Sequence, residues 1–188
     1  AAHPDVHRVG FGLRIDDLPD HYASKADVIA WESPFWQQEI APGLFSAPID
    51  GAFELWRLDI ADGSVERLTR GEHYLSGWDA VAGPRGRTRL AYLRSTPTEA
   101  PDLWLQDGGG AAKRLTSFND EVLGELTLTP AVERHVTVDG RDIQGWFISA
   151  GDAPQPLVLQ IHGGPHSLYA WAPFWEFQVL AAGGIGIF

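Results

Sequence analysis

Residues 157–165 read Leu-Val-Leu-Gln-Ile-His-Gly-Gly-Pro. Four of the first five residues are apolar, and such a run, followed at once by turn residues, predicts a strand buried on both faces of a mostly parallel sheet. The predicted strand ends at His162 and two glycines, at the carboxyl edge of the sheet, where open α/β sheets bind their ligands. The stretch therefore predicts an α/β unit with a functional loop at the end of one strand.

The residues that follow predict the rest of this unit. Pro173 suits the first turn of a helix, and Gly183 is a natural C-terminal stop. The apolar positions of this predicted helix are Phe174, Trp175, Phe177, Val179 and Leu180. Residues 185–188 then begin a second apolar strand, so that strand, helix and strand form a βαβ unit.

A hairpin is predicted upstream, with strands at residues 134–138 and 143–148 joined across Asp139-Gly140-Arg141. Residues 149–156 are rich in Gly and Pro and predict a loop. Beyond Arg141 the sequence contains no Lys or Arg. We place a domain boundary near residues 129–134 on this change of composition.

Two copies of one pattern precede the boundary. Residues 53–58 read Phe-Glu-Leu-Trp-Arg-Leu and lead to Arg-Leu-Thr at 67–69, while residues 102–106 read Asp-Leu-Trp-Leu-Gln and lead to a second Arg-Leu-Thr, 47 positions after the first. Residues 77–78 and 89–93 predict two further strands between the copies. A period of about 40–50 residues with four short strands is typical of a β-propeller blade.

Asp-Gly pairs at 50–51, 62–63 and 107–108 supply the positive φ that tight hairpin turns need. The alternative is an ordinary β-sandwich in which the similarity is coincidental. Because two or three blades cannot close a propeller, we expect the whole polypeptide to be longer. Residues 1–50 are poorly placed: residues 9–15 alternate like a half-buried strand, and Asp16-Asp17 reads as a surface turn rather than a catalytic pair.

The composition excludes several classes of function. With 188 residues, 44% apolar and 21% charged, the chain is globular rather than disordered. A net charge of −11 and only 14 scattered Lys and Arg residues argue against nucleic-acid binding. The absence of cysteine excludes disulfides and thiol nucleophiles. The longest apolar run is about half of the ~20 residues that span a bilayer, and no signal pattern begins the chain, so we expect a soluble, cytoplasmic protein without membrane partners.

The His-Gly-Gly loop has a physical use in acyl transfer. Glycines let the backbone approach a reacting carbonyl, and a free N–H there can donate to a tetrahedral oxyanion. In α/β-hydrolases this loop supplies one donor, and the residue after a Gly-x-Ser-x-Gly nucleophile supplies the other. None of the serines of this chain lies in that motif.

The run from residue 136 to 188 resembles the start of the catalytic domain of prolyl oligopeptidase family serine peptidases, in the acylaminoacyl-peptidase and dipeptidyl-peptidase-like branch. The upstream repeats are similar to the last blades of that family's propeller, so the resemblance covers residues 50 to 188. The motifs that carry it are Asp139-Gly140, Gly145-Trp146, residues 157–159, residues 162–166 (His-Gly-Gly-Pro-His), Phe174, residues 176–178 and Leu180-Ala181. The implied fold is a partial β-propeller, residues 1–130, followed by the truncated start of an α/β-hydrolase domain, residues 131–188.

The resemblance implies a serine peptidase that hydrolyses short peptides through an acyl-enzyme, without a cofactor, and leaves a homo-oligomer open. The oxyanion role falls to the backbone of Gly164, with Gly163 shaping the turn. The catalytic Ser, Asp and His lie further downstream in the family and have no counterpart here. The 188-residue chain alone is therefore expected to be inactive.

The remaining residues of the motif have alternative interpretations. His162 either orients the loop by hydrogen bonds or contacts substrate, and His166 is a loop residue. A metal site at His162 and His166 is disfavoured, because Gly-Gly-Pro between them argues against a helix. Trp171, Trp175 and Phe177 indicate core or interface packing rather than a substrate pocket, and Glu176 a solvated helix position.

Two further hypotheses remain open from the sequence. One keeps the hydrolase fold but makes the protein an esterase, which Pro165 and the upstream blades disfavour. The other is a non-catalytic β-propeller interaction module whose C-terminal part is only structural.

Overall fold

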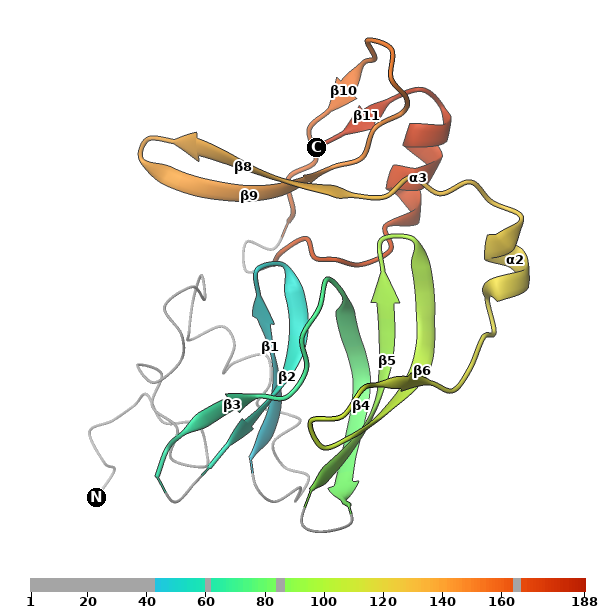
Figure 1. The fold of residues 1–188 in the computed structure, drawn as a ribbon. Coiled ribbons are helices and arrows are strands. Elements are labelled where there is room, and N and C mark those ends of the chain that lie inside the picture. The colour runs from blue at the N-terminus through green and yellow to red at the C-terminus, as the bar shows by residue number, and fades with distance from the viewer. Residues whose placement is uncertain (1–42, 60–61, 84–86, 164–166) are drawn as a thin grey trace.

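In a computed structural model, residues 43–59, 62–83, 87–163 and 167–188 are described. Their strands form one large sheet and two small ones, and the longer of the two described helices lies near the C-terminus (Figure 1). In chain order the elements are β1 (Leu44–Ile49), β2 (Ala52–Leu58), β3 (Val65–Arg67), β4 (Tyr74–Ala82), β5 (Thr88–Thr96), β6 (Glu99–Asp107), β7 (Lys113–Arg114), α2 (Asp120–Gly124), β8 (Val132–Val138), β9 (Arg141–Phe147), β10 (Leu157–Val158), α3 (Trp175–Ala182) and β11 (Gly186–Ile187).

The large sheet consists of two antiparallel groups. Strands β4, β5, β6 and β7 pair in sequence order, as do β1, β2 and β3. Only one parallel residue pair, Phe53 with Tyr74, joins the groups. Four consecutive antiparallel strands beside the last three strands of a similar unit are consistent with a partial β-propeller, as the repeat spacing predicts.

An apolar cluster holds the two groups together. Leu44 and Leu55 of the first group pack with Leu75, Leu90 and Tyr92 of the second, and each of these side chains is at most 7% exposed. Burying such side chains contributes about 1.5–3 kcal/mol each. The contact between the groups is therefore a hydrophobic core.

The predicted hairpin turns are confirmed in detail. Asp50 and Gly51 have φ values of 49° and 74°, which close the β1–β2 turn in the left-handed region. Asp139 and Gly140, with 51° and 75°, do the same between β8 and β9.

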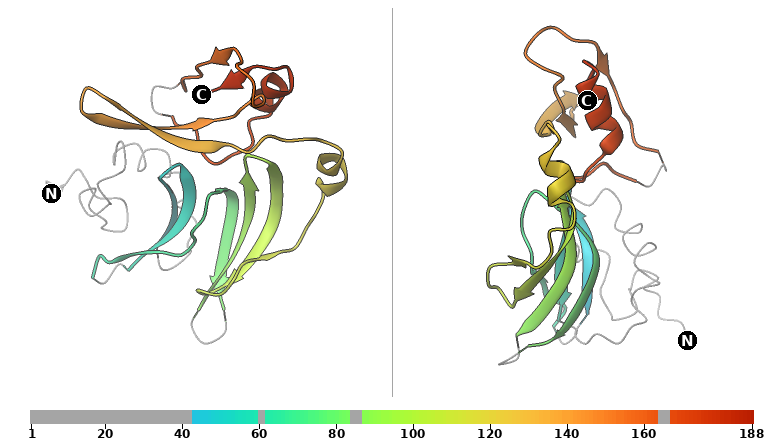
Figure 2. Two further views of the ribbon diagram at one scale, coloured as in Figure 1. Left: turned by 45° about the horizontal axis from the view of Figure 1, so that its top comes forward. Right: turned by 90° about the vertical axis from the view of Figure 1, so that its right-hand side faces the viewer.

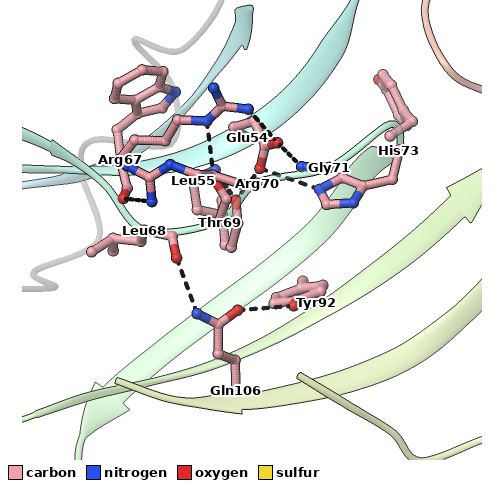
Figure 3. A network of polar contacts seen from close by, with 12 residues as sticks. Glu54, Leu55, Arg67, Leu68, Thr69, Arg70, Gly71, His73, Tyr92 and Gln106 are labelled. Atoms are coloured by element: carbon pink, nitrogen blue, oxygen red, sulfur yellow. Dashed lines mark hydrogen bonds and ion pairs between the residues drawn. The ribbon is translucent and has the colours of Figure 1, made fainter. Parts of the chain in front are cut away.

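The repeated sequence forms a repeated polar network (Figure 3 shows the first copy). In the first copy the buried carboxylate of Glu54 accepts a hydrogen bond from Arg67 Nη2 at 2.8 Å and another from the hydroxyl of Thr69. The same hydroxyl accepts the backbone N–H of Leu55 at 2.9 Å. A buried carboxylate is thereby matched with a cation and several donors, which burial requires.

The second copy repeats these contacts one blade later. Asp102 accepts hydrogen bonds from Arg114 and from Thr116 Oγ1, the latter at 2.6 Å, and Thr116 Oγ1 accepts the N–H of Leu103 at 2.9 Å. The similarity of the two sequence copies therefore has a structural cause, because each copy ties a strand to the one that follows it. The repeated network agrees with the repeat interpretation, whereas the β-sandwich alternative treats the sequence similarity as coincidental.

The C-terminal unit lies beyond the turns of the large sheet (Figure 2). Strands β8 and β9 form the predicted hairpin, and Ile148, just past β9, bridges antiparallel to Ile187 of β11. Strand β11 pairs in parallel with β10, and α3 connects them, so the predicted βαβ unit is present. Helix α3 ends at Ala182 with Gly183 as its C-cap, where the stop was predicted. It begins at Trp175 with Phe174 as its N-cap, so the prediction that Pro173 lies in the first turn and Phe174 within the helix is wrong.

Two details of the predicted strand at residues 157–161 are wrong. Only Leu157 and Val158 form β10, although Gln160 N still donates to Phe188 O at 2.8 Å. The strand is not buried on both faces, since Leu157 is 59% exposed and Ile161 76%. The physical reason is that β11 is the one strand paired with β10 among the described residues, so β10 is an edge strand there and not the central strand, covered on both faces, that the prediction assumed.

The predictions for residues 9–15 and for Asp16-Asp17 lie outside the described residues. The division into domains at residues 130 and 131 stays a prediction.

Candidate active-site loop and the junction beside it

The large sheet meets the C-terminal unit at the β1–β2 turn. Trp171 N donates to Gly51 O at 2.9 Å, and the indole of Trp146 lies against Gly51 so closely that a Cβ there would come within 2.2 Å of it. Trp146 and Trp171 contact each other edge to face, with ring centroids 5.6 Å apart. Trp171 is buried, which confirms the prediction of interface packing.

A cavity of about 450 Å³ lies beside this junction. The large sheet contributes the end of β1, including Pro48, the β1–β2 turn, and Pro97 between β5 and β6. The C-terminal unit contributes most of the remaining wall. The titratable side chains among the described lining residues are Asp50, His162 and Tyr169. The lining is otherwise apolar or amide-bearing, so this wall can orient a ligand and donate hydrogen bonds.

His162 forms part of that wall. His162 is exposed, its Nδ1 lies 3.0 Å from the carbonyl oxygen of Gly163, and its ring meets Tyr169 edge-on at 6.2 Å. These contacts agree with a role in orienting the loop. Gly163 faces open space, with no atom within 4 Å of where a Cβ would stand. Gly164, to which the oxyanion role was assigned, and His166 lie outside the described residues.

An aromatic cluster contacts the loop through Tyr169, which packs against His162. Tyr169 meets Phe174 at 5.0 Å and Phe177 at 5.4 Å, both edge to face, and Phe174 stacks on Phe177 at 5.1 Å. Phe177 is buried, as predicted, in the core that also contains Ile148 and Ile187. Trp175 is 42% exposed, so the expectation of core packing is wrong for this residue, which points away from α3's buried face. Glu176 is exposed, as predicted.

Two contacts of this region have no signal in the sequence. The side-chain amide of Gln178 accepts the N–H of Thr129 at 2.8 Å and donates to the carbonyl oxygen of the same residue at 2.9 Å. Trp146 packs on Gly51 across 95 positions of sequence. Both are long-range contacts, and local periodicity carries no information about them.

In the part of the chain that the structure describes, no group of three or more His, Asp or Glu side chains is arranged to hold a metal ion. Within the same residues, no helix is long and apolar enough to cross a membrane.

Comparison with known proteins gives two curated relatives. The chain is 38% identical over 164 residues to the uncharacterized peptidase YuxL of Bacillus subtilis, a match that covers 84% of this chain and 24% of that protein. It is 25% identical over 158 residues to dipeptidyl-peptidase 5 of Porphyromonas gingivalis, covering 79% of this chain and 22% of that protein. The chain thus spans about a quarter of the length of these relatives.

Solved structures of acylaminoacyl peptidase have a similar fold. The enzyme of Pyrococcus horikoshii matches with a TM-score of 0.66 and 27% identity, over 77% of this chain and 22% of that one. A complex of acylaminoacyl peptidase with Z-Gly-Gly-Phe-chloromethyl ketone matches with the same TM-score and 26% identity, over the same shares of the two chains. No family model matches the chain.

Proposed function

Because this chain is a relative of the peptidases of the prolyl oligopeptidase family, matching about a quarter of their length, we propose that it is part of a serine peptidase. In this proposal residues 1–130 supply propeller blades and residues 131–188 begin an α/β-hydrolase domain. The second assignment is supported by the parallel pair of β10 and β11, which α3 connects, and by the Ile148–Ile187 bridge, which joins this pair to the segment just past β9.

The place of the His162–Gly163 loop carries the proposal. The loop follows the parallel strand β10 and lines a cavity that the turns of the large sheet also line. In open α/β sheets ligands bind at this end of the strands. A peptide bound there would have its scissile carbonyl beside the glycine backbone.

In the proposed mechanism the backbone N–H of Gly164 donates to the oxyanion of the tetrahedral intermediate, Gly163 shapes the turn, and His162 orients the loop. The nucleophilic Ser and its His and Asp partners would come from sequence outside these 188 residues, and the reaction would pass through an acyl-enzyme. One oxyanion donor contributes about 2.7–4 kcal/mol to transition-state stabilisation. This chain would therefore provide one side of the active site.

The substrate class proposed is short peptides, as the relatives' names suggest for those proteins. The complex of acylaminoacyl peptidase with Z-Gly-Gly-Phe-chloromethyl ketone supports a peptide as the class of ligand proposed here. Cytoplasmic location and self-association remain predictions of the sequence.

A fluorophosphonate probe tests the proposal directly, because it labels activated serines covalently. We expect labelling of the full-length polypeptide and none of the purified 188-residue chain. Labelling of the short chain would contradict the assignment of the nucleophile. A full-length polypeptide that neither reacts with the probe nor cleaves peptides would favour the non-catalytic interaction module, and preferential turnover of carboxylic esters would favour the esterase.

A further inference from the structure

The side chain of Gln178 bonds both backbone groups of one residue far away in the sequence. Thr129 N donates to Gln178 Oε1 at 2.8 Å and Gln178 Nε2 donates to Thr129 O at 2.9 Å, across 49 positions. Gln178 is 8% exposed, so its amide is removed from water and depends on these two hydrogen bonds. The side-chain amide of Gln178 thus bonds the N–H and C=O groups of Thr129 as the backbone of a neighbouring β-strand would.

The two partners belong to segments with different roles. Thr129 lies between α2 and β8, in the segment that leaves the large sheet and enters the C-terminal unit. Gln178 lies in α3, the helix that follows the His-Gly-Gly loop. Two residues after Thr129, Ala131 packs against the core that contains Phe177. The amide of Gln178 therefore fixes the entering segment to α3.

A continuous series of contacts leads from Gln178 to the loop. Its chain neighbour Phe177 is 6% exposed and meets Tyr169 at 5.4 Å, and Tyr169 meets the ring of His162 at 6.2 Å. The N–H of Trp171, two residues after Tyr169, donates to Gly51 O on the large sheet. A displacement of α3 would thus move Tyr169 and the ring that rests against it.

We propose that Gln178 is a positioning residue of the His162–Gly163 loop, which it holds in place by fixing α3 to Thr129. The proposal rests on the proposed function for its catalytic consequence, since the loop is taken to carry the oxyanion donor. Gln178 lies among the buried residues of α3, lines the same cavity as His162, and acts on the loop through Phe177 and Tyr169. Misplacing catalytic groups by about 1 Å can cost up to about a hundredfold in rate.

The test compares three variants of the full-length polypeptide. Gln178→Leu keeps most of the side-chain volume and removes both hydrogen bonds. Gln178→Glu keeps an acceptor for Thr129 N but places a carboxylate oxygen against Thr129 O. The control is Val179→Ala, at the next helix position, where the side chain is 71% exposed.

Two readouts are measured at a temperature where every variant is folded. The first is kcat and KM for a short peptide together with the rate of fluorophosphonate labelling. We expect Gln178→Leu to lower kcat by about ten- to a hundredfold with KM changed less than threefold, Gln178→Glu to fall between, and Val179→Ala to match the unsubstituted protein. The second is amide hydrogen exchange of residues 157–177, which should be faster in Gln178→Leu and unchanged in Val179→Ala.

A merely structural role for Gln178 would lower the melting temperature but leave kcat and the exchange of residues 157–163 unchanged, and this result would overturn the proposal. If the unsubstituted polypeptide neither reacts with the probe nor cleaves peptides, the proposed function fails. The exchange comparison then decides by itself whether Gln178 positions the loop.

Discussion

Glu54 and Asp102 occupy equivalent places on β2 and β6, and each accepts hydrogen bonds from the Arg and the Thr of the next Arg-Leu-Thr segment. Their further partners differ. Glu54 also accepts the N–H of Gly71 at 2.8 Å and lies 3.2 Å from His73 Nε2, whereas Asp102 accepts the N–H of Phe118 at 3.3 Å. One carboxylate thus fixes the connection into β4, and the other fixes the segment that leaves the sheet.

Replacing Glu54 with Ala should destabilise the protein by about 3 kcal/mol. The side chain is fully buried, and its removal leaves Arg67 without its anion and His73 without the contact to Glu54, which typically costs about 3–5 kcal/mol. Arg67 retains some contact with water, which places the expected value at the lower end. Urea unfolding of Glu54→Ala and the parent measures the difference.

The matched control is Glu66→Ala, which removes the exposed partner of Arg57 on the neighbouring strand. Surface pairs of this kind contribute at most about 1 kcal/mol. Equal effects of the two substitutions would show that the buried network adds nothing beyond a surface ion pair.

Lowering the pH should reduce the folding stability of the protein through protonation of Glu54. Burial by itself would raise the pKa of this carboxyl, but hydrogen bonds from His73, Thr69 and Arg67 outweigh it and hold the pKa below its ordinary value of 4.5. A group whose folded pKa is depressed stabilises the fold above its unfolded pKa, and this contribution is lost as the pH falls through the folded pKa. The urea midpoint should therefore drop below about pH 4.5, and Glu54→Gln should show a shallower drop.

The contribution of His135 to stability should change with pH in the opposite direction to that of Glu54. Its Nδ1 lies 2.6 Å from Asp142 Oδ2 and its Nε2 3.1 Å from Glu133 Oε1, and these carboxylates, Asp142 first, raise its pKa above the ordinary value of 6.5. The stabilisation is complete below pH 6.5 and is lost as the pH rises through the folded pKa. The NMR titration of the His135 ring should have its midpoint above 6.5, and Asp142→Asn should lower it. An unchanged midpoint in Asp142→Asn would contradict the ion pair.

Alanine substitutions at Gly51 and Gly63 distinguish the cost of backbone strain from the cost of a steric clash. Their φ values are 74° and 77°, so Ala at either position costs about 1–2 kcal/mol in the left-handed region. A Cβ at Gly63 meets nothing within 4 Å, whereas one at Gly51 would lie 2.2 Å from Trp146 Cζ2. Gly51→Ala should therefore destabilise the protein by about 1–3 kcal/mol more than Gly63→Ala in urea unfolding. Equal losses would show that Trp146 does not pack on the turn.

The repeats, the hairpin turns and the βαβ unit could be predicted because local rules determine them. Asp-Gly pairs mark positive φ, and the copies of Arg-Leu-Thr report a network that each blade builds within itself. The extent of β10 could not be predicted, because the length and burial of a parallel strand depend on the neighbours it finds. Leu159 is 61% exposed although its sequence reads as core.

The candidate site was predictable only as a loop. The sequence indicates His162 and Gly163 through the motif, but Tyr169, Gln178 and Gly51 contribute through contacts between distant segments. Each of these residues has an adequate local explanation, as a loop residue, a helix position or a turn. Nothing in the local pattern distinguishes such a residue from one that meets another part of the fold.

The β1–β2 turn has a consequence for protein engineering. The carbonyl oxygen of Gly51 accepts the N–H of Trp171, and Trp146 packs where Gly51 has no side chain. The turn and the two tryptophans therefore form one interface, and replacing the turn alone would disturb it. A chimera that grafts this C-terminal unit onto the blades of another protein would have to transplant the Asp50-Gly51 turn with it. Grafts that carry both tryptophans but substitute a bulkier turn should assemble the two halves at the wrong angle.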